Sequence, residues 1–279
     1  MTTFQKPRAN PHRKRRDIIP YWLLAIILLG VILGWAIVAD SDYRQIWRTL
    51  SGGVITTLYV TFIAFALACL LGLAVAMART SSVRVLREIA TFYTEIVRGI
   101  PILVLLFYVA FVGAPALVEA FNWAASPLID AGAMPALTVR NFDLTWRAIF
   151  ALTIGYSAFI AEVFRAGIEA VEKGQIEAAR SLGLSRWHTF RLIIAPQAIR
   201  TILPPLGNDF VSMIKDSALV SALGVQDITQ LGKVYSASSF KFFETYNVVA
   251  FLYLTMTISL SLLVRALEHR MARGRQGER

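Results

Sequence analysis

Polar and charged side chains interrupt the apolar stretch at 201–224, where they could hold a small charged solute. Charges at membrane depth are costly unless they face water or a protein interior, so they are functional candidates by default. Helical spacing places Asn208, Ser212 and Lys215 on one face and two acidic residues on the neighbouring face. This stripe offers both signs of charge, which a zwitterion would need. The candidate pathway residues are Asn208, Asp209, Ser212, Lys215, Asp216 and Ser217.

A structural role is the alternative for this stripe. Lys215 could pair with Asp216 or with Asp209, and such a pair would hold helices together without lining a pathway. The two roles are not exclusive.

A basic, amphipathic segment at 177–196 lies between apolar stretches and is itself too polar to cross a bilayer. Gly183 and the small Ala178-Ala179 pair permit a sharp turn and a close backbone approach. A two-helix elbow of this kind could fit a cleft on a soluble partner and transmit rigid-body motion. An ordinary basic inner loop is the alternative. The candidate docking residues are Glu177, Ala178, Ala179, Gly183, Leu184 and Arg186.

Two further groups of residues are candidates for a gate or hinge. Arg98, Gly99 and Pro101 break helix regularity near the inner end of the third apolar stretch, although Arg98 could instead extend towards lipid headgroups. Glu162 and Arg165 lie three residues apart near the inner end of the fourth stretch, a spacing that favours an ion pair within one helix. For that pair, a structural role is favoured over gating.

Six apolar stretches are long enough to cross a bilayer, and they predict an all-α integral membrane protein. The chain is 56% hydrophobic and 16% charged, a balance that soluble domains rarely show. Lys and Arg are concentrated on one side of these stretches, so both termini are expected in the cytoplasm. The net charge of +10 then needs no nucleic acid to explain it. The predicted spans are 20–39, 56–78, 89–113, 146–168, 201–224 and 246–267.

One membrane domain with short tails is expected. Basic cytoplasmic tails occupy 1–19 and 268–279, and the first span, 20–39, is interpreted as a retained anchor. Cleavage of that span as a signal peptide is the alternative, but its apolar run exceeds the ~7–15 residues of a signal core.

The connections on the outer side are expected to be irregular. Residues 43–50 predict a short helix on the outer surface, and Ser51-Gly52-Gly53 is expected to end it. The loop at 113–145 contains several prolines and is predicted to be too broken to span the membrane.

The sequence carries no motif of an ATPase, a hydrolase or a metal site. Gly232-Lys233 lacks the upstream glycine of a phosphate-binding loop, so any ATP and Mg²⁺ must be bound by a separate polypeptide. The three histidines lack metal-ligand spacing, and Cys69 has no partner for a disulfide within the chain. We therefore expect no cofactor, no metal and no enzymatic activity.

Several motifs occur in a specific order. They are Thr56-Thr57-Leu58, Tyr93-Thr94-Glu95-Ile96-Val97-Arg98-Gly99-Ile100-Pro101, Ala161-Glu162-Val163-Phe164-Arg165-Ala166-Gly167-Ile168, Glu177-Ala178-Ala179 followed by Gly183 and Ala195-Pro196, Pro204-Pro205-Leu206-Gly207-Asn208, and Lys215-Asp216-Ser217-Ala218-Leu219. This set, over about 53–267, resembles the permease subunits of ABC importers for polar amino acids, and the segment beginning at Glu177 is similar to their EAA loop. Ala195 departs from the usual leucine before the proline.

The resemblance implies a type I importer permease domain of five transmembrane helices at 53–267, with the EAA loop at 169–199 in the cytoplasm; the span at 20–39 adds a sixth helix. It implies import of a polar amino acid, such as histidine, glutamine, glutamate, arginine or an opine, across the bacterial cytoplasmic (inner) membrane. The implied partners are ABC ATPase subunits, a second permease subunit, identical or homologous, a periplasmic or lipid-anchored binding protein, and membrane lipids. The alternative is a secondary transporter or channel without an ATPase, which would predict an inverted repeat that the sequence does not show.

Overall fold

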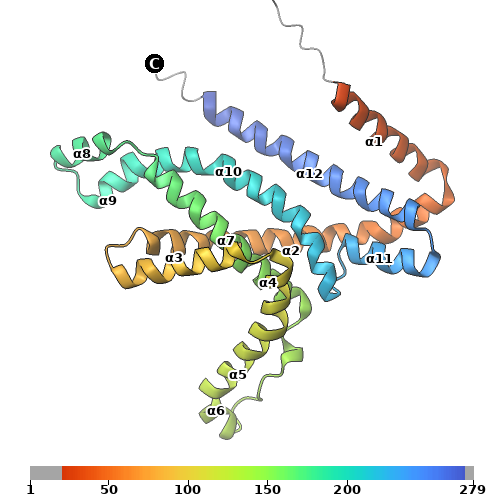
Figure 1. Cartoon of the computed structure of the whole chain (residues 1–279), viewed down its shortest axis with the longest axis horizontal. Helices are drawn as coiled ribbons and strands as arrows, with labels where there is room; N and C mark the ends of the chain where they lie inside the picture. The colour runs from red at the N-terminus through yellow and green to blue at the C-terminus, as the bar shows by residue number, and fades with distance from the viewer. Residues whose placement is uncertain (1–20, 274–279) are drawn as a thin grey trace, which may run out of the picture.

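The computed structural model describes residues 21–273, and within that range it is helical, with no strand. The predicted tail at 1–19 lies outside the described residues, as does the part of the tail at 268–279 that begins at residue 274. Figure 1 shows an elongated bundle with α8 and α9 at one end and α11 at the other. In chain order the elements are α1 (Tyr21–Ala39), α2 (Ser41–Arg79), α3 (Arg84–Gly99), α4 (Ile102–Tyr108), the π-helical turn η1 (Val109–Gly113), α5 (Ala114–Ala124), α6 (Ser126–Asp130), η2 (Val139–Asn141), α7 (Leu144–Glu169), α8 (Lys173–Ser181), α9 (Arg186–Thr189), the π-helical turn η3 (Phe190–Ile194), α10 (Ala195–Asp216), the 3₁₀ segment η4 (Ser217–Leu223), α11 (Ile228–Ser239) and α12 (Phe242–Arg273).

The prediction of an all-α membrane protein is confirmed. In the described part of the chain, four helical stretches are long and apolar enough to cross a membrane: Ser41–Arg79, Ile102–Ala124, Leu144–Glu169 and Phe242–Glu268. The predicted anchor corresponds to α1, which adds a shorter apolar stretch at Leu24–Ala39. The fifth predicted span corresponds to α10 and η4, which do not meet the same criterion; α10 carries both acidic and basic residues.

The long helix α2 corrects one expectation. Ser51-Gly52-Gly53 does not end a surface helix, because α2 runs without interruption from residue 41 to residue 79. At Gly53 a Cβ atom would lie 2.6 Å from the backbone nitrogen of Ile228 at the start of α11. Gly53 therefore permits close helix approach, which outweighs its weak helix propensity.

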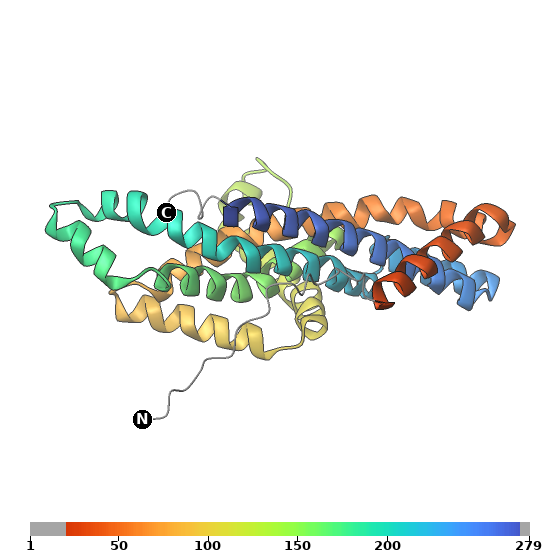
Figure 2. The same cartoon turned by 90° about the horizontal axis from the view of Figure 1, so that it is seen from above.

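The centre of the bundle is the contact between α2 and α7, and these two helices run side by side with α10 and α12 in both views (Figures 1 and 2). Small residues form the seam: a Cβ atom at Gly72 would lie 2.9 Å from both the Ser157 carbonyl oxygen and the Ile160 side chain. Ala64 and Ala68 are fully buried on the same side of α2. In a membrane, where lipid is as apolar as leucine, such close backbone packing is a main source of helix association.

The third predicted span, 89–113, is wrong in its bounds. The helix breaks where Ile100 has an extended backbone (φ −97°, ψ 133°) before Pro101, and the apolar helical stretch that follows is Ile102–Ala124. The residues before the break form the separate helix α3, which packs along α2 and α7. A residue before proline is disfavoured in helical conformation, which explains the break.

The helix that follows continues past Gly113 through Pro115, so part of the loop predicted at 113–145 is helical. The π-helical turn η1 explains why the proline is tolerated. The amide of Ala114 donates to the carbonyl of Val109, five residues back, and this wider turn displaces the carbonyl that a proline ring would otherwise meet. The same arrangement recurs where η3 precedes Pro196, since the amide of Ala195 donates to the carbonyl of Phe190.

The segment at 114–143 is held against the bundle by hydrogen bonds from one buried arginine. Arg147 on α7 is 9% exposed, and its guanidinium donates to the carbonyl oxygens of Phe142, Val139 and Ala110. The last of these carbonyls belongs to η1. The segment at 114–143 is thus fastened to α7 at both of its ends.

Candidate docking and transport sites

The segment predicted to form an elbow does so, with α8 and α9 at its tip. Gly183 has φ +79°, a left-handed conformation that favours glycine. The amide of Leu184 donates to the carbonyl of Ala179 (3.1 Å) and the amide of Gly183 to that of Arg180 (3.0 Å), so α8 ends in a Schellman turn. Ser185 then caps α9 by accepting from the amide of His188. In Figures 1 and 2 this elbow projects from one end of the bundle.

The six predicted docking residues differ in how exposed their side chains are. Glu177, Ala178, Gly183 and Arg186 are exposed, and Leu184 is half-buried. Ala179 is 4% exposed, so it packs within the elbow instead of being offered to a partner.

Two exposed apolar side chains at the tip were missing from the predicted set. Leu182 is 84% exposed and Trp187 is 64% exposed, with the Trp187 ring stacked on Phe190 at 6.1 Å between centroids. A large apolar residue within an otherwise basic, polar loop was the sequence signal that pointed to them. Exposed apolar groups rimmed by polar ones are typical of interaction surfaces.

The elbow is tied to the membrane helices on both of its arms. The Gln197 side-chain amide on α10 donates to the Gln175 side-chain oxygen on α8 at 2.6 Å. Val171, in the connection from α7, is buried. A displacement of the tip would therefore be passed to α7 and α10 together.

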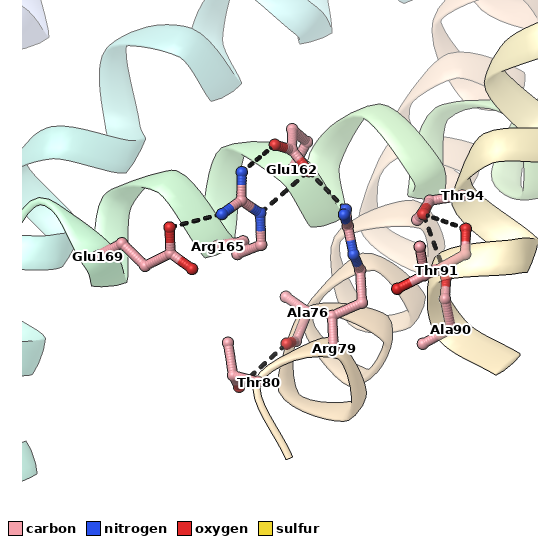
Figure 3. Close-up of polar contacts among 9 residues, drawn as sticks. All are labelled: Ala76, Arg79, Thr80, Ala90, Thr91, Thr94, Glu162, Arg165 and Glu169. Carbon is pink, nitrogen blue, oxygen red and sulfur yellow. Dashed lines mark hydrogen bonds and ion pairs between the residues drawn. The ribbon is translucent and has the colours of Figure 1, made fainter. Parts of the chain in front are cut away.

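A network of charges lies near the same end, on α2 and α7 (Figure 3). The predicted pair is present, since the Arg165 guanidinium binds the Glu162 carboxylate. Arg165 also reaches Glu169 at 2.5 Å, and Arg79 from α2 reaches Glu162 at 2.5 Å. The Arg79 contact, which sequence reasoning missed, joins two helices; its side chain is only 14% exposed.

The other gate candidates lie elsewhere. Arg98 and Gly99 end α3, about 20 Å along that helix from its first residue at 1.5 Å per residue. The Arg98 guanidinium lies over the Phe159 ring, 5.6 Å from its centroid, a cation–π geometry. Pro101 begins the next helix. Phe159 lies three residues before Glu162 on α7, but among the described residues no hydrogen bond or ion pair joins Arg98 to Glu162 or Arg165.

The polar stripe on α10 divides between two surfaces. Asn208 and Lys215 are exposed and Ser212 is half-buried on one side. Asp216 faces α7, where it accepts a hydrogen bond of 2.7 Å from the Tyr156 hydroxyl. The structure thus places the Lys215 ammonium group on a different surface of α10 from the Asp216 carboxylate.

The remaining members of the stripe are more enclosed. Asp209 is half-buried, and within residues 21–273 its Oδ2 atom is buried without a hydrogen-bond partner. Ser217 is buried at the end of α10 and donates to the carbonyl of Ile214 at 2.7 Å. In the same range Lys215 forms no ion pair with Asp209 or Asp216, so the structural pairing considered for it is not observed there.

Apolar helices long enough to cross a membrane, an exposed elbow at one end and a polar stripe on α10 are features of a membrane transport component. The chain belongs to the family of binding-protein-dependent transport system inner membrane components, whose model matches residues 68–273.

Relatives of known description support this assignment. The glutamine transport system permease protein GlnP of Escherichia coli (strain K12) is 34% identical over 233 residues, 82% of this chain and 97% of that protein. The probable glutamine ABC transporter permease protein GlnM of Bacillus subtilis (strain 168) is 38% identical over 219 residues, covering 78% and 91%. A crystal structure of an amino acid ABC transporter with histidines contains a chain that is 36% identical, with a TM-score of 0.69 and coverage of 82% and 97%. The resemblance seen in the sequence is confirmed.

Proposed function

We propose that this chain is the permease subunit of an ATP-binding-cassette importer that moves polar amino acids across the cytoplasmic membrane. The family assignment supports a transport role, and similar proteins are described as permeases for glutamine or L-cystine. The elbow is the single observation that carries the mechanism. It is a capped turn that projects from the bundle, and its exposed apolar side chains would contact a soluble partner.

Separate ATPase subunits, which bind ATP and Mg²⁺, would grip this elbow. Their closure would displace α8 and α9, and the Gln197–Gln175 hydrogen bond would pass that movement to α10. Import requires that ATP and a loaded external binding protein stabilise the same state of the permease, because coupling between two ligands is reciprocal. ATP binding would then convert an inward-open pathway into an outward-open one.

Trp187→Ala tests the docking. Removing an exposed, stacked aromatic group at the elbow tip should weaken ATPase binding at least tenfold, in the range expected for an aromatic interface anchor. The measurement is ATPase affinity for the purified permease in nanodiscs. Trp123→Ala is the matched control, since Trp123 is 82% exposed on α5, far from the elbow in Figure 1. Equal affinity for the Trp187→Ala and wild-type proteins would contradict docking at this tip.

The exposed polar face of α10 would line the pathway against a second permease subunit. Lys215 and Asn208 lie on the surface of the single chain, and lipid is a costly neighbour for a lysine at membrane depth. A second permease, identical or homologous, would enclose this face, and Lys215 would then meet the carboxylate of the transported amino acid. Asp209 and Asp216 are the candidate partners for its ammonium group.

Lys215→Met tests the pathway. The variant should lower uptake at least tenfold while leaving ATPase affinity unchanged, because Lys215 lies about 30 Å along α10 from Ala195, where the elbow joins the helix. The assay is uptake of a panel of amino acids by proteoliposomes that contain the complete transporter and its binding protein. Uptake by the Lys215→Met protein at the wild-type rate would remove this residue from the pathway.

A further inference from the structure

A groove opens on the side of the bundle between α2, α10 and α12. It encloses about 480 Å³, and its walls are apolar except for one carboxylate. Phe62 and Phe65 on α2 pack edge-on against Phe210 on α10, with centroids 6.1 and 4.9 Å apart. Gly207 contacts Val264, because a Cβ atom there would lie 2.5 Å from it. The helices are therefore closely packed at the base of the groove, and the groove is the space that their side chains leave unfilled above it.

The two ends of the groove differ in polarity. Glu268, the carboxylate in its lining, lies near the C-terminal end of α12, on the side predicted to face the cytoplasm. Arg200 is exposed on α10 three residues before Leu203, which also lines the groove, so Arg200 lies one turn closer to the elbow on the same face. The groove thus has charged side chains at its cytoplasmic end, and the rest of its lining is apolar.

The direction in which the groove faces indicates what covers it. At 100° per residue, Leu203 and Phe210 lie on roughly the opposite side of α10 from Ser212 and Lys215. If a second permease encloses the polar side, as the proposed pathway requires, the groove faces away from that subunit. Its neighbour is then the lipid of the inner leaflet.

The charges at the rim select among lipid headgroups. Among the residues whose side chains the structure describes, which end at Glu268 in this helix, neither Arg200 nor Glu268 forms an ion pair. A phosphate would pair with the arginine, and a primary ammonium would donate hydrogen bonds to the carboxylate. Phosphatidylethanolamine carries both groups. Phosphatidylglycerol carries the same phosphate but would place neutral glycerol hydroxyls, instead of an ammonium, at Glu268.

We propose that this groove binds one acyl chain of a phosphatidylethanolamine molecule from the inner leaflet, with the lipid's phosphate at Arg200 and its ammonium at Glu268. The lipid fills the gap between α2, α10 and α12 and becomes part of the surface that the permease shows to the membrane.

Native mass spectrometry of the purified, delipidated full-length chain tests this site, with an equimolar mixture of phosphatidylethanolamine and phosphatidylglycerol as the probe. The wild-type chain should retain one lipid, mainly phosphatidylethanolamine. Leu203→Trp fills the groove and should lower retention at least fivefold, whereas Leu254→Trp, a comparably exposed leucine on α12 outside the groove, should not. Glu268→Gln should keep the retained lipid but abolish the preference for phosphatidylethanolamine, whereas the control Glu88→Gln should leave that preference intact.

Retention by Leu203→Trp at the wild-type level would overturn the proposal. A preference that is unchanged in Glu268→Gln would overturn the assignment of the headgroup, even if the tryptophan variant folded poorly. Formation of a dimer that Leu203→Trp abolishes would show that a second copy, not a lipid, covers the groove. These measurements use no ATPase and no amino acid, so a negative result here is separate from a failure of the transport proposal.

Discussion

Replacing Gly183 separates the shape of the elbow from its surface chemistry. With φ +79°, this residue holds a left-handed turn that costs other L-residues about 1–2 kcal/mol, while asparagine tolerates it better and valine tolerates it worst. No atom lies within 4 Å of the position that a Cβ atom would take at Gly183, so a substitution meets no steric conflict inside the chain. The whole cost is therefore conformational, and it falls on the turn between α8 and α9.

If the ATPase docks on the native turn, Gly183→Ala should weaken its affinity by up to about 5–30-fold, the equivalent of 1–2 kcal/mol. Gly183→Val should weaken it more, and Gly183→Asn should retain most of it. The assay is ATPase binding to the permease in nanodiscs, measured for all three variants. Gly132 provides the matched control, since it has φ +70°, no atom within 4 Å of a Cβ and a place between α6 and η2, outside the elbow.

The order of the variants decides the outcome. Equal losses for the alanine and asparagine variants would show that the ATPase surface excludes any side chain at this position, and the conformational argument would be refuted. Unchanged affinity in Gly183→Val would show that the turn plays no part in docking. A loss in Gly132→Val as large as that in Gly183→Val would point to general instability.

Two predictions concern the stability of the bundle. Glu162→Gln should lower the free energy of unfolding by about 1–2 kcal/mol, because it weakens the contacts with Arg79 and Arg165; this value is reduced for the partial exposure of the side chains. Thermal unfolding of the purified chain measures the effect, with Glu88→Gln as the control. Equal stability of the two variants would contradict the prediction. Gly72→Ala should lower the free energy of unfolding by about 1–3 kcal/mol, because the new Cβ would lie 2.9 Å from the Ile160 side chain and force α2 and α7 apart. Gly34→Ala is the control, since nothing lies within 4 Å of a Cβ there. A Gly72→Ala protein as stable as this control would contradict the prediction.

Features that depend on neighbours along the chain were predictable from the sequence. Apolar stretches revealed membrane helices, because a spanning helix must be apolar over about 20 consecutive residues. The Glu162–Arg165 pair followed from a separation of three residues, and the turn at Gly183 from a glycine that follows a short helix-forming run. These interactions are contained within one or two turns of helix, where spacing determines geometry.

The errors in the prediction also have local and non-local causes. Gly52-Gly53 was expected to break a helix because glycine has a low helix propensity, but contact with α11 stabilises the continuous form. Pro115 was expected to interrupt helical structure, but the π-helical turn before it accommodates the proline ring. In both cases a backbone arrangement that composition does not encode overrides the preference of a single residue.

Contacts between distant segments were decided by the tertiary structure. Arg79 and Glu162 are 83 positions apart, and Tyr156 and Asp216 are 60 positions apart, so no sequence periodicity relates the members of either pair. The same holds for the groove between α2, α10 and α12, whose walls come from three separate helices. The sequence by itself determined that the chain is a set of apolar membrane helices joined by polar segments, because hydropathy and spacing act over one helix. Which faces meet, and which charges remain free for a solute or a lipid, depended on the packing of those helices against one another.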